Sequence, residues 1–347
     1  MMFNKSFLTI FFYFFRNPKW RDTFYPTYKN FLLKRGFKIY NFHLIDNLIQ
    51  DFPEKVNNGN DYVSFNNVTV FSEAFIRLDE KSFFIIDNYA YYELLKDLSY
   101  YRDNKPKTEI DKAYLMLGMY SKTFNLFHFL TDALIPNLPS DESQKHLPNL
   151  IPPINNTFQK DFFKLLNLEN NIEVVAPIKV KNLILKKRLS KWDCTTYDLF
   201  REKLNFNLNI NTTVKIIYIS RKNAKRLFKN EDVLLGYLRA YNIKVVDFSS
   251  ITLNERIDLL SDAAILIGQY GAGLTNMVFM PNDSHVIDLQ IGNWVKNDYC
   301  LLANACRLKY VNVSFPIKFT KNDPYQLTYD DLYQIKCSLD LIISTKQ

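Results

Sequence analysis

The sequence predicts an α/β protein built on a doubly wound parallel sheet, and three observations support this. The second half of the chain alternates short apolar runs with amphipathic segments, which is typical of βαβ units whose helices cover both faces of a parallel sheet. The chain has 347 residues, which favours two domains over one small core. Hydrophobic residues make up 47% of it, which predicts packed cores rather than disorder.

The elements of the second half follow from where the apolar runs begin and end. Short apolar runs predict strands, and longer segments with apolar residues at helical spacing predict helices. Two acidic residues at 231–232 favour the start of a helix. We therefore expect strands at 214–220, 243–249, 264–268, 284–290 and 309–314, and helices at 230–241, 253–263, 274–280, 297–307 and 329–344.

The first half is less regular but also mixes strands and helices. The apolar runs predict strands at 83–88, 112–118, 172–177 and 180–187, and a helix at 124–138 that ends at a proline. The stretch 190–213 is polar and rich in Asn towards its end, which predicts a linker. We therefore divide the chain into domains at 1–195 and 196–347, and allow the last helix to pack back on the first domain.

Charge and cysteine usage restrict the partners. The formal net charge of +8 favours an acidic ligand or surface. Nucleic acid is disfavoured, because the lysines are scattered and the chain carries no Arg-rich arm, zinc-finger motif or RNP-like motif. The four cysteines include no CxxC pair, which predicts free thiols in a reducing compartment.

An apolar run at residues 7–15, flanked by basic residues within 5–21, leaves two readings open. It is too short to span a bilayer as a helix, and no small-residue cleavage site follows it. It is either a core element of the first domain or a surface anchor whose basic flanks bind anionic lipid. We expect a cytoplasmic protein, with peripheral membrane contact through residues 5–21 as the alternative.

Glycines concentrate at the end of one predicted strand. Gly268, Gly271 and Gly273 lie within six residues, although the chain has only eight glycines. In open α/β sheets ligands bind beyond the carboxyl ends of the strands, and small residues before a helix expose backbone N–H groups there. The spacing is neither a dinucleotide fingerprint nor a P-loop. The loop predicts an anion site to which Thr275 and Asn276 add side-chain donors, with a tight packing turn as the alternative.

A basic cluster follows another strand of the same predicted sheet. Ser220, Arg221, Lys225 and Arg226 leave the strand at the edge where the glycine loop is expected. Two guanidinium groups there can bind phosphate in bidentate fashion. A solvated basic turn is the structural alternative.

A third cluster lies in the first half. Asn125, His128 and Asp132 are spaced i, i+3 and i+7, which places them on one face of a helix. A histidine with a carboxylate one turn away is a candidate general base, and a hydrogen-bonded core histidine is the alternative. No HExxH, Cys/His set or Asp-x-Asp motif occurs, so we expect no metal.

These three clusters, in this order, resemble glycosyltransferase family 61. That family carries an N-x-x-H-[FW]-[LT]-x-[DE] segment, matched here at 125–132, and a strand that ends in SR, matched at Ser220–Arg221. An R…NE segment matches Arg226 and 230–231. Its loop G-x-H-G-A-G-L-T-N, followed by LFMPPGSxVIEL, is similar to residues 268–290. The resemblance covers roughly residues 115–290.

The resemblance implies a GT-B-like fold in which two Rossmann-like domains face a cleft. It also implies an inverting transfer of a sugar from a nucleotide-diphosphate donor, typically UDP-linked, to a hydroxyl of a glycan or surface polysaccharide, with no metal or other cofactor. One position departs from the family, because Tyr270 stands where members usually have His. A tyrosine donates a hydrogen bond but cannot carry the charge of an imidazolium.

The resemblance also suggests roles for individual residues. His128, oriented by Asp132, is the candidate base, with Asp132 acting directly as the alternative, and Asn125 lies on the acceptor side. Glu231 is expected to contact the nucleoside. The diphosphate is expected to bind Arg221, Arg226, Tyr270, Gly271, Ala272, Gly273, Thr275 and Asn276. A non-catalytic nucleotide-binding protein of the same fold, and another anion-binding α/β transferase such as a phosphotransferase, remain alternatives.

Overall fold

The computed structural model describes residues 34, 36–40, 50–59, 61–72, 75–85, 98–116, 125–140, 144, 146–151, 153–154, 156–168, 170–187, 192–204, 214–221, 228–292, 296–315 and 325–345. The chain divides into two compact units. The first consists of Met1–Thr123, Asp132–Asn155 and Glu169–Arg188, and the second of Phe124–Thr131, Asn156–Leu168 and Leu189–Gln347. The second unit thus takes in two short segments that precede the boundary expected at residue 195.

The described strands of the first unit form one mixed sheet of nine strands. The order is β1-β5-β4-β3-β9-β6-β7-β8, with β2 paired to β3. The long central pair β3–β9 is antiparallel, whereas β9 and β6 are parallel. This pairing differs from the parallel sheet of a Rossmann-like domain that the resemblance implies here. The strands are β1 (Lys38–Tyr40), β2 (Val56–Asn58), β3 (Tyr62–Phe71), β4 (Phe75–Arg77), β5 (Ser82–Ile85), β6 (Thr108–Leu115), β7 (Asn149–Ile151), β8 (Asn171–Glu173) and β9 (Ile178–Lys186).

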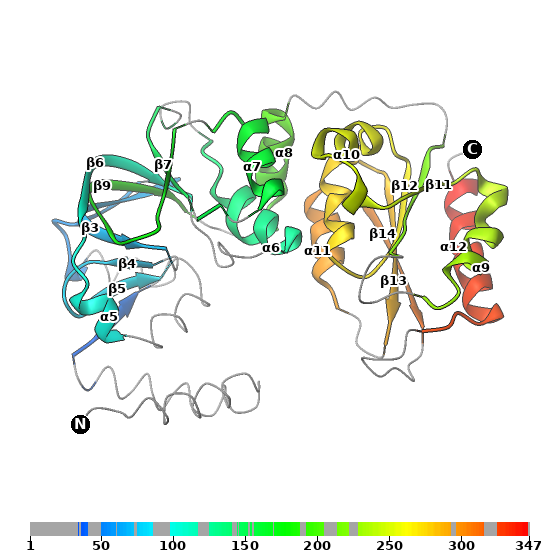
Figure 1. Cartoon of the computed structure of the whole chain (residues 1–347), viewed down its shortest axis with the longest axis horizontal. Coiled ribbons are helices and arrows are strands. Elements are labelled where there is room, and N and C mark those ends of the chain that lie inside the picture. Colours follow the sequence, from blue (N-terminus) through cyan, green and yellow to red (C-terminus); the bar gives the residue numbers. More distant parts are fainter. Residues whose placement is uncertain are drawn as a thin grey trace. The chain divides into compact units, whose positions relative to one another are not determined.

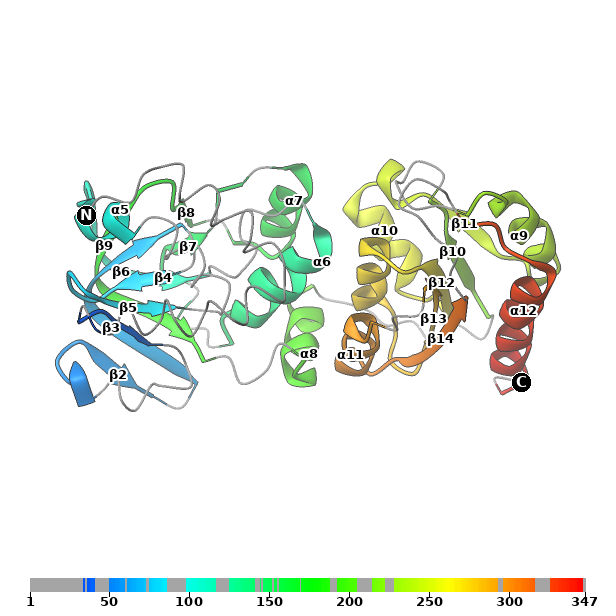
Figure 2. The same ribbon diagram turned by 90° about the horizontal axis from the view of Figure 1, so that it is seen from below.

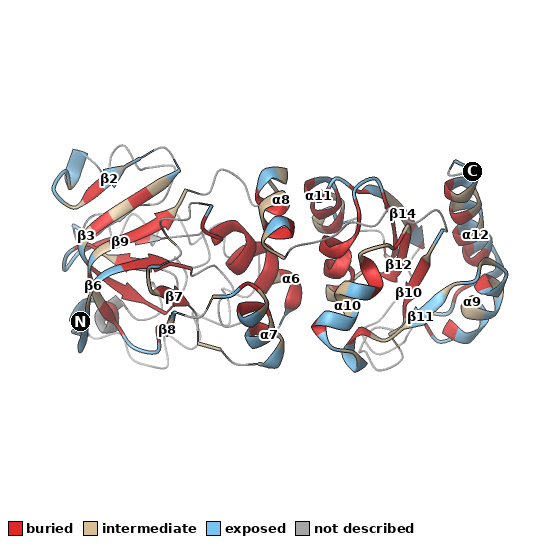
Figure 3. Ribbon diagram, turned by 90° about the horizontal axis from the view of Figure 1, so that it is seen from above, coloured by how far each residue is buried: buried red, intermediate tan, exposed pale blue. Residues whose placement is uncertain are grey.

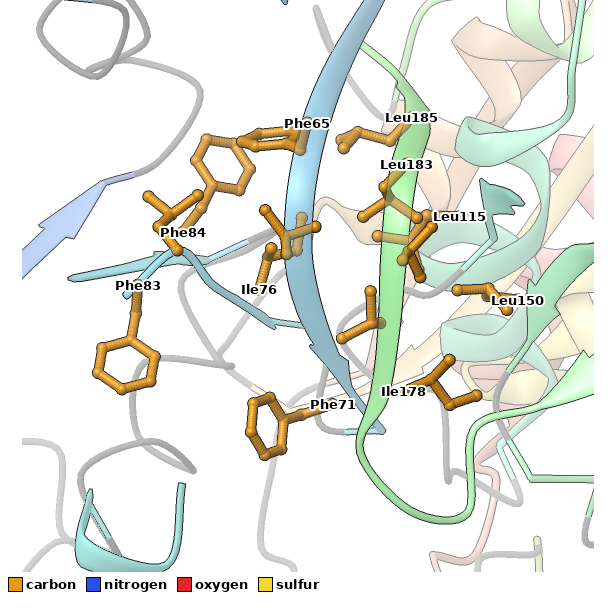
Figure 4. Packing of buried hydrophobic residues seen from close by; sticks show 14 of the residues in the cluster. Phe65, Phe71, Ile76, Phe83, Phe84, Leu115, Leu150, Ile178, Leu183 and Leu185 are labelled. Atoms are coloured by element: carbon orange, nitrogen blue, oxygen red, sulfur yellow. The ribbon is translucent and has the colours of Figure 1, made fainter. Parts of the chain in front are cut away.

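The core of the first unit forms on the central strands of this sheet. Phe65 of β3 packs on Phe84 of β5 with ring centroids 5.0 Å apart, and Leu183 of β9 is buried in the same cluster (Figure 4). Burying side chains of this size contributes roughly 1.5–3 kcal/mol each. Helix α5 (Leu98–Asp103) joins the cluster through Tyr101, whose ring packs edge-on to Phe71.

The second unit carries the predicted doubly wound sheet. Its five strands are all parallel and run in the order β11-β10-β12-β13-β14. Helices α10 and α11 lie on one face and α9 and α12 on the other (Figures 1 and 2). Figure 3 shows β10 and β12 as buried, as expected for a sheet covered on both faces. The elements are β10 (Ile216–Ile219), α9 (Glu231–Leu238), β11 (Lys244–Val246), α10 (Leu253–Leu260), β12 (Ile265–Gln269), β13 (His285–Ile291), α11 (Asp298–Ala305), β14 (Lys309–Phe315) and α12 (Tyr329–Ser344).

The last helix packs on the sheet of its own unit. A capping box fixes its start, because the Thr328 hydroxyl accepts from the N–H of Asp331 while the Asp331 carboxylate accepts from the N–H of Thr328. Its apolar face, including Ile335 and Leu339, is buried against the strands. Of the two arrangements that the sequence left open for this helix, the structure shows packing on the sheet of its own unit. An amphipathic helix buries its apolar face against a neighbouring apolar surface.

Part of the stretch expected to be a linker is a helix. Helix α8 (Cys194–Lys203) begins at Asp193, whose side chain accepts from the N–H of Thr195. Tyr197 and Phe200 are fully buried on one side of it. The prediction of a linker over 190–213 is therefore wrong for 194–203, because two aromatic residues on one helix face outweigh the polar composition; residues 205–213 lie outside the described part of the chain.

The helix expected over 124–138 is irregular. It consists of α6 (Leu126–His128), a π-helical segment η2 (Phe129–Leu134) and a 3-10 turn η3 (Ile135–Asn137). Pro136 lies in the first positions of that turn, where its missing N–H costs no hydrogen bond. The proline therefore marks a change of helix type.

Four phenylalanines hold the early helices to the second unit. Phe162 of helix α7 (Thr157–Leu165) and Phe200 of α8 both pack on Phe279, at the end of the 3-10 helix η7 (Ala272–Phe279). Phe129 of η2 joins the cluster through Phe162. The rings of Phe162 and Phe279 are stacked 6.2 Å apart. Such aromatic pairs contribute about 0.5–1.5 kcal/mol beyond the burial of their area. This cluster explains why segments far apart in sequence belong to one compact unit.

Two leucines of α12 provide a matched test of its packing. Leu339 is fully buried, whereas Leu341 is 68% exposed. We expect Leu339→Ala to lower the free energy of unfolding by about 2–5 kcal/mol, and Leu341→Ala to change it by less than about 0.5 kcal/mol. Urea unfolding followed by circular dichroism measures both, and equal losses would contradict the packing of α12 described above.

Candidate functional site

The candidate site lies where the strand order of the second unit's sheet reverses. From β10 the chain runs outward to β11, whereas β12 leads to β13 on the other side, so the switch point falls between β10 and β12. Ile219 of β10 is paired with Gly268 of β12 at the carboxyl ends of these strands. Ligands of doubly wound sheets bind in the crevice at such a switch point. Two predicted clusters, Ser220–Arg221 and the glycine loop, follow these two strands.

The structure brings Arg221 and the glycine loop together. The Nη1 atom of Arg221 donates a hydrogen bond of 2.9 Å to the carbonyl oxygen of Tyr270. A Cβ atom at residue 271 would lie 2.5 Å from the same nitrogen. Only a glycine at this position lets the guanidinium rest on the loop, and the φ of +157° at Gly271 is itself one that other residues rarely adopt.

The other two glycines serve packing. A Cβ at Gly268 would lie 3.0 Å from the Cδ1 atom of Ile219, and a Cβ at Gly273 would lie 3.3 Å from its Cγ2 atom. These glycines let η7 approach the end of β10 closely. Both interpretations of the glycine loop therefore apply, but at different residues. Gly271 makes room for a cation beside a candidate anion site, whereas Gly268 and Gly273 allow close packing.

Backbone donors are available in the same loop. The N–H of Tyr270 bonds to Leu289, and the first bond of η7 runs from the N–H of Leu274 to the carbonyl of Gly271. Between them, the N–H groups of Gly271, Ala272 and Gly273 have no backbone acceptor within the described residues. Unpaired N–H groups at the start of a helix, next to a guanidinium, can bind an anion.

Two expected side-chain donors point into the protein instead. Thr275 is fully buried, and Asn276 is 1% exposed with its Nδ2 bonded to the carbonyl of Gly273. The cause is the 3-10 helix, whose residues from Leu274 to Phe279 are all buried. The loop thus offers backbone groups to a ligand, in contrast to the side-chain donors expected from the sequence.

Glu231 supports the end of β10. Its Oε1 atom accepts from the Tyr218 hydroxyl and the Arg221 N–H, and its Oε2 atom accepts from the Ser220 hydroxyl. The Glu231 side chain is buried. Burial of the Tyr218 hydroxyl, together with the neighbouring Glu231 carboxylate, raises the pKa of Tyr218. Because its oxygens bind three donors of the protein, we do not assign Glu231 to a nucleoside. The sequence could not show this, since the donors lie on a different element.

Tyr270 turns its hydroxyl towards α11. The hydroxyl donates to Oδ2 of Asp298 at 2.9 Å, and the ring packs edge-on to Tyr299 with centroids 4.9 Å apart. The Nζ atom of Lys296 lies 5.6 Å from the centre of the Tyr270 ring. Burial and the Asp298 carboxylate raise the pKa of Tyr270, so the phenol keeps its proton. In this structure that proton is directed at Asp298.

The His128 cluster lies on the helix that begins the irregular segment. The Asn125 side chain accepts from the N–H of Phe127 and caps α6, so it has a structural role besides the acceptor-side role expected of it. His128 is half-buried at the last position of α6, and Asp132 is buried within the π-helical segment. Such π-helical segments often occur at functional sites. The orientation of His128 by Asp132 stays a prediction.

Aromatic rings connect α6 to the glycine loop within the second unit. Phe127, next to His128, packs edge-on to Tyr299 at 5.1 Å, and Tyr299 packs on Tyr270 at 4.9 Å. Helix α6 also packs against η7. His128 therefore belongs to the unit that carries the glycine loop, whereas the sequence placed it on the first domain.

One buried acid was not singled out from the sequence. Asp288 of β13 is fully buried, and its Oδ2 accepts from the hydroxyl of Tyr310 at 2.6 Å and from Nε2 of Gln290 at 3.0 Å. Its Oδ1 has no partner among the described residues. Burial raises the pKa of this carboxyl to about 6. The available signal was an acidic residue inside an otherwise apolar strand.

Some predicted features lie outside the described residues, namely Arg226 with Lys225 in 222–227, and the N-terminal stretch 5–21. In the part of the chain that is described, no group of three or more His, Cys, Asp or Glu residues could hold a metal ion. No helix among those residues combines the length and apolar character needed to cross a membrane.

The match to a known family covers this site. Residues 126–287 match the family described as glycosyltransferase 61. The matched segment begins at α6 and reaches into β13, so it includes His128, Arg221 and the glycine loop. Across this segment the chain is similar to glycosyltransferase family 61.

Two curated relatives are similar to this chain over short stretches. The EGF domain-specific O-linked N-acetylglucosamine transferase of Drosophila melanogaster is 34% identical over 79 residues, which is 22% of this chain and 15% of the relative. The protein O-linked-mannose beta-1,4-N-acetylglucosaminyltransferase 2 of Xenopus laevis is 29% identical over 90 residues, 25% of this chain and 16% of the relative. The chain thus matches only a small part of either protein.

Among solved structures, the rubredoxin oxygen:oxidoreductase of Desulfovibrio gigas is similar at a TM-score of 0.30 and 14% identity, over 49% of this chain and 44% of that protein. A TM-score this low supports no conclusion about fold or function.

Because the pKa of Asp288 is raised in the folded protein, we expect the free energy of unfolding to depend on pH. The folded protein binds this proton more tightly than the unfolded chain, so the carboxyl group favours folding most below its ordinary pKa of 3.8 and loses this contribution as the pH rises through about 6. We expect the stability of the wild type, relative to Asp288→Asn, to fall by on the order of 3 kcal/mol between pH 4 and pH 7. Urea unfolding at several pH values measures this, and a constant difference between the two proteins would contradict it.

Proposed function

We propose that this protein is an inverting glycosyltransferase that moves a sugar from a nucleotide-diphosphate donor to a hydroxyl of a glycan. The observation that carries the proposal is the Arg221 guanidinium on Gly271 at the switch point of the sheet, beside N–H groups that have no backbone acceptor in the described part of the chain. The match of residues 126–287 to glycosyltransferase family 61 supports the reaction class. Both relatives are named as N-acetylglucosamine transferases, which makes UDP-N-acetylglucosamine the first donor to test.

The chemical task of the loop is to stabilise the leaving diphosphate. Negative charge develops on the diphosphate oxygen as its bond to the anomeric carbon of the sugar breaks. Fixed hydrogen-bond donors aimed at that charge lower the barrier. Arg221 supplies a positive charge, and the N–H groups at 271–273 supply donors that need no rearrangement. Arg226 belongs to the same proposal from its place in the sequence. These groups would do the work that a divalent metal does in other transferases.

His128 is the residue we propose as general base. The acceptor hydroxyl loses its proton as its oxygen attacks the anomeric carbon, and a single displacement inverts that centre. His128 is half-buried and so remains reachable, whereas Asp132 is only 4% exposed, which suits a residue that orients the histidine. The aromatic rings between α6 and the loop support a fixed place for His128 in the same unit.

Other parts of the sequence prediction stay proposals. They are the GT-B-like arrangement of two domains, a UDP-linked donor, a surface-polysaccharide acceptor, independence from metals, and a cytoplasmic location with peripheral membrane contact through residues 5–21. The parallel sheet of the second unit is compatible with a Rossmann-like domain, whereas the sheet of the first unit is mixed.

Nucleotide binding tests the anion site directly. We expect UDP to raise the thermal midpoint of the wild type without added metal, and Arg221→Ala to weaken UDP binding roughly 10- to 100-fold because a charge-assisted bond is lost. Gly271→Ala should act in the same direction, since its Cβ displaces the guanidinium. Calorimetric titration measures the affinities. Arg239→Ala, at an exposed arginine of the same unit, is the control, and equal loss in that variant would refute a specific role of Arg221.

Transfer assays test the base. His128→Ala should lower the transfer rate by roughly 100- to 10,000-fold and leave UDP affinity near the wild-type value, because a general base acts in the chemical step. Release of UDP in the presence of donor and acceptor measures the rate. His146→Ala, at an exposed histidine, is the matched control. Full transfer by His128→Ala would leave Asp132 as the candidate.

A second function is favoured by one observation. Position 270 is a tyrosine where the family that the chain resembles usually has a histidine, so the loop lacks a ring nitrogen there. The Tyr270 hydroxyl is directed at Asp298 instead. A non-catalytic protein that binds nucleotide sugars through the same loop would show UDP affinity without turnover. A phosphotransferase would instead need a metal-binding carboxylate pair.

A further inference from the structure

Tyr270 is tied down through each of its polar groups. Its N–H bonds to the carbonyl of Leu289 at 3.0 Å, and its carbonyl accepts from Arg221 at 2.9 Å. Its hydroxyl donates to Asp298 at 2.9 Å, and its ring packs on Tyr299. One residue therefore connects the ends of β10, β12 and β13 with the first turn of α11.

The bond to Asp298 has consequences for Arg221. The position of the Arg221 guanidinium depends on where the Tyr270 carbonyl points, because that carbonyl accepts from its Nη1 atom. The residue after Tyr270 is a glycine and gives the backbone little stiffness of its own. The side chain of Tyr270, fixed at its far end by Asp298, restricts rotation of the peptide group that carries the Tyr270 carbonyl. The ring contact with the buried Tyr299 acts in the same sense.

A direct role of the hydroxyl in binding an anion fits the structure poorly. A phenol has one proton to donate, and here a carboxylate, which is a strong acceptor, takes it. Breaking that bond would leave the Asp298 carboxylate without this donor beside the place where an anion is expected. The ammonium group of Lys296 over the Tyr270 ring offsets some of that negative charge, in keeping with an intact pair.

We propose that Tyr270 is a positioning residue: anchored by Asp298, it aims its carbonyl so that the Arg221 guanidinium stays on Gly271, and its hydroxyl does not bind the donor. This inference rests on the proposed function, in which Arg221 binds the diphosphate. It assigns Asp298, on a different helix, to the same task.

A double-mutant cycle in the full-length chain tests the pair. Tyr270→Phe and Asp298→Ala should each weaken UDP binding roughly 3- to 10-fold, and the double variant should be no weaker than either single variant. Asp298→Asn keeps an acceptor for the hydroxyl and should restore most of the affinity. The KM for the donor should rise while kcat at saturating donor stays within about twofold, as expected for loss of uniform binding.

If the hydroxyl bound the donor directly, Tyr270→Phe would weaken binding while Asp298→Ala would not, and the two changes would add. That outcome overturns the proposal. Tyr325→Phe is the matched control, because Tyr325 also donates a 2.9 Å bond to an aspartate, Asp331, at the start of a helix. It should cost comparable stability and leave UDP affinity unchanged; a loss of affinity there would mark the Tyr270 effect as general destabilisation.

A ligand-free measurement separates this inference from the proposed function. In a crystal structure of Tyr270→Phe we expect the bond from Arg221 Nη1 to the carbonyl of residue 270 to be broken. Persistence of that bond at its original length overturns the positioning role, whatever the protein binds. If instead the wild type bound no nucleotide diphosphate while the variant still lost the bond, the proposed function would fail and the positioning role would stand.

Discussion

The close approach of a guanidinium to a glycine backbone is the constraint on which the candidate site depends. Arg221 reaches Gly271 only because residue 271 has no side chain, and it is held there by the carbonyl of Tyr270. Its own backbone is fixed from the other side by the carboxylate of Glu231. A cation held at both ends loses little freedom when an anion binds, which is how pre-organisation strengthens binding.

Aromatic packing explains how distant segments come to share this site. The stacked pair of Phe162 and Phe279 joins α7 to the end of η7, and Phe127 joins α6 to Tyr299 beside the loop. Both helices precede the expected domain boundary. The large apolar area of these rings outweighs proximity along the chain and brings His128 into the unit that carries the glycine loop.

Buried acids surround the switch point of the sheet. Glu231 is balanced by three donors, whereas Asp288 keeps one oxygen without a partner, and its pKa rises to about 6. Burying a carboxylate in this way costs stability, and proteins accept such costs mainly at functional sites. Asp288 of β13 is paired with Gly268 of β12, so this buried carboxylate lies beside the strand end that leads into the glycine loop.

The sequence by itself determined the parts of this protein that depend on local pattern. The parallel sheet of the second unit, the bounds of α12 and the meeting of Arg221 with the glycine loop all follow from periodicity and from the rule that parallel strands end at one edge. Tertiary structure alone decided the mixed pairing of the first sheet, the burial of Thr275 and Asn276, and the partners of Glu231 and Tyr270. These depend on which side chains meet across elements far apart in sequence, and a local pattern does not specify a long-range partner.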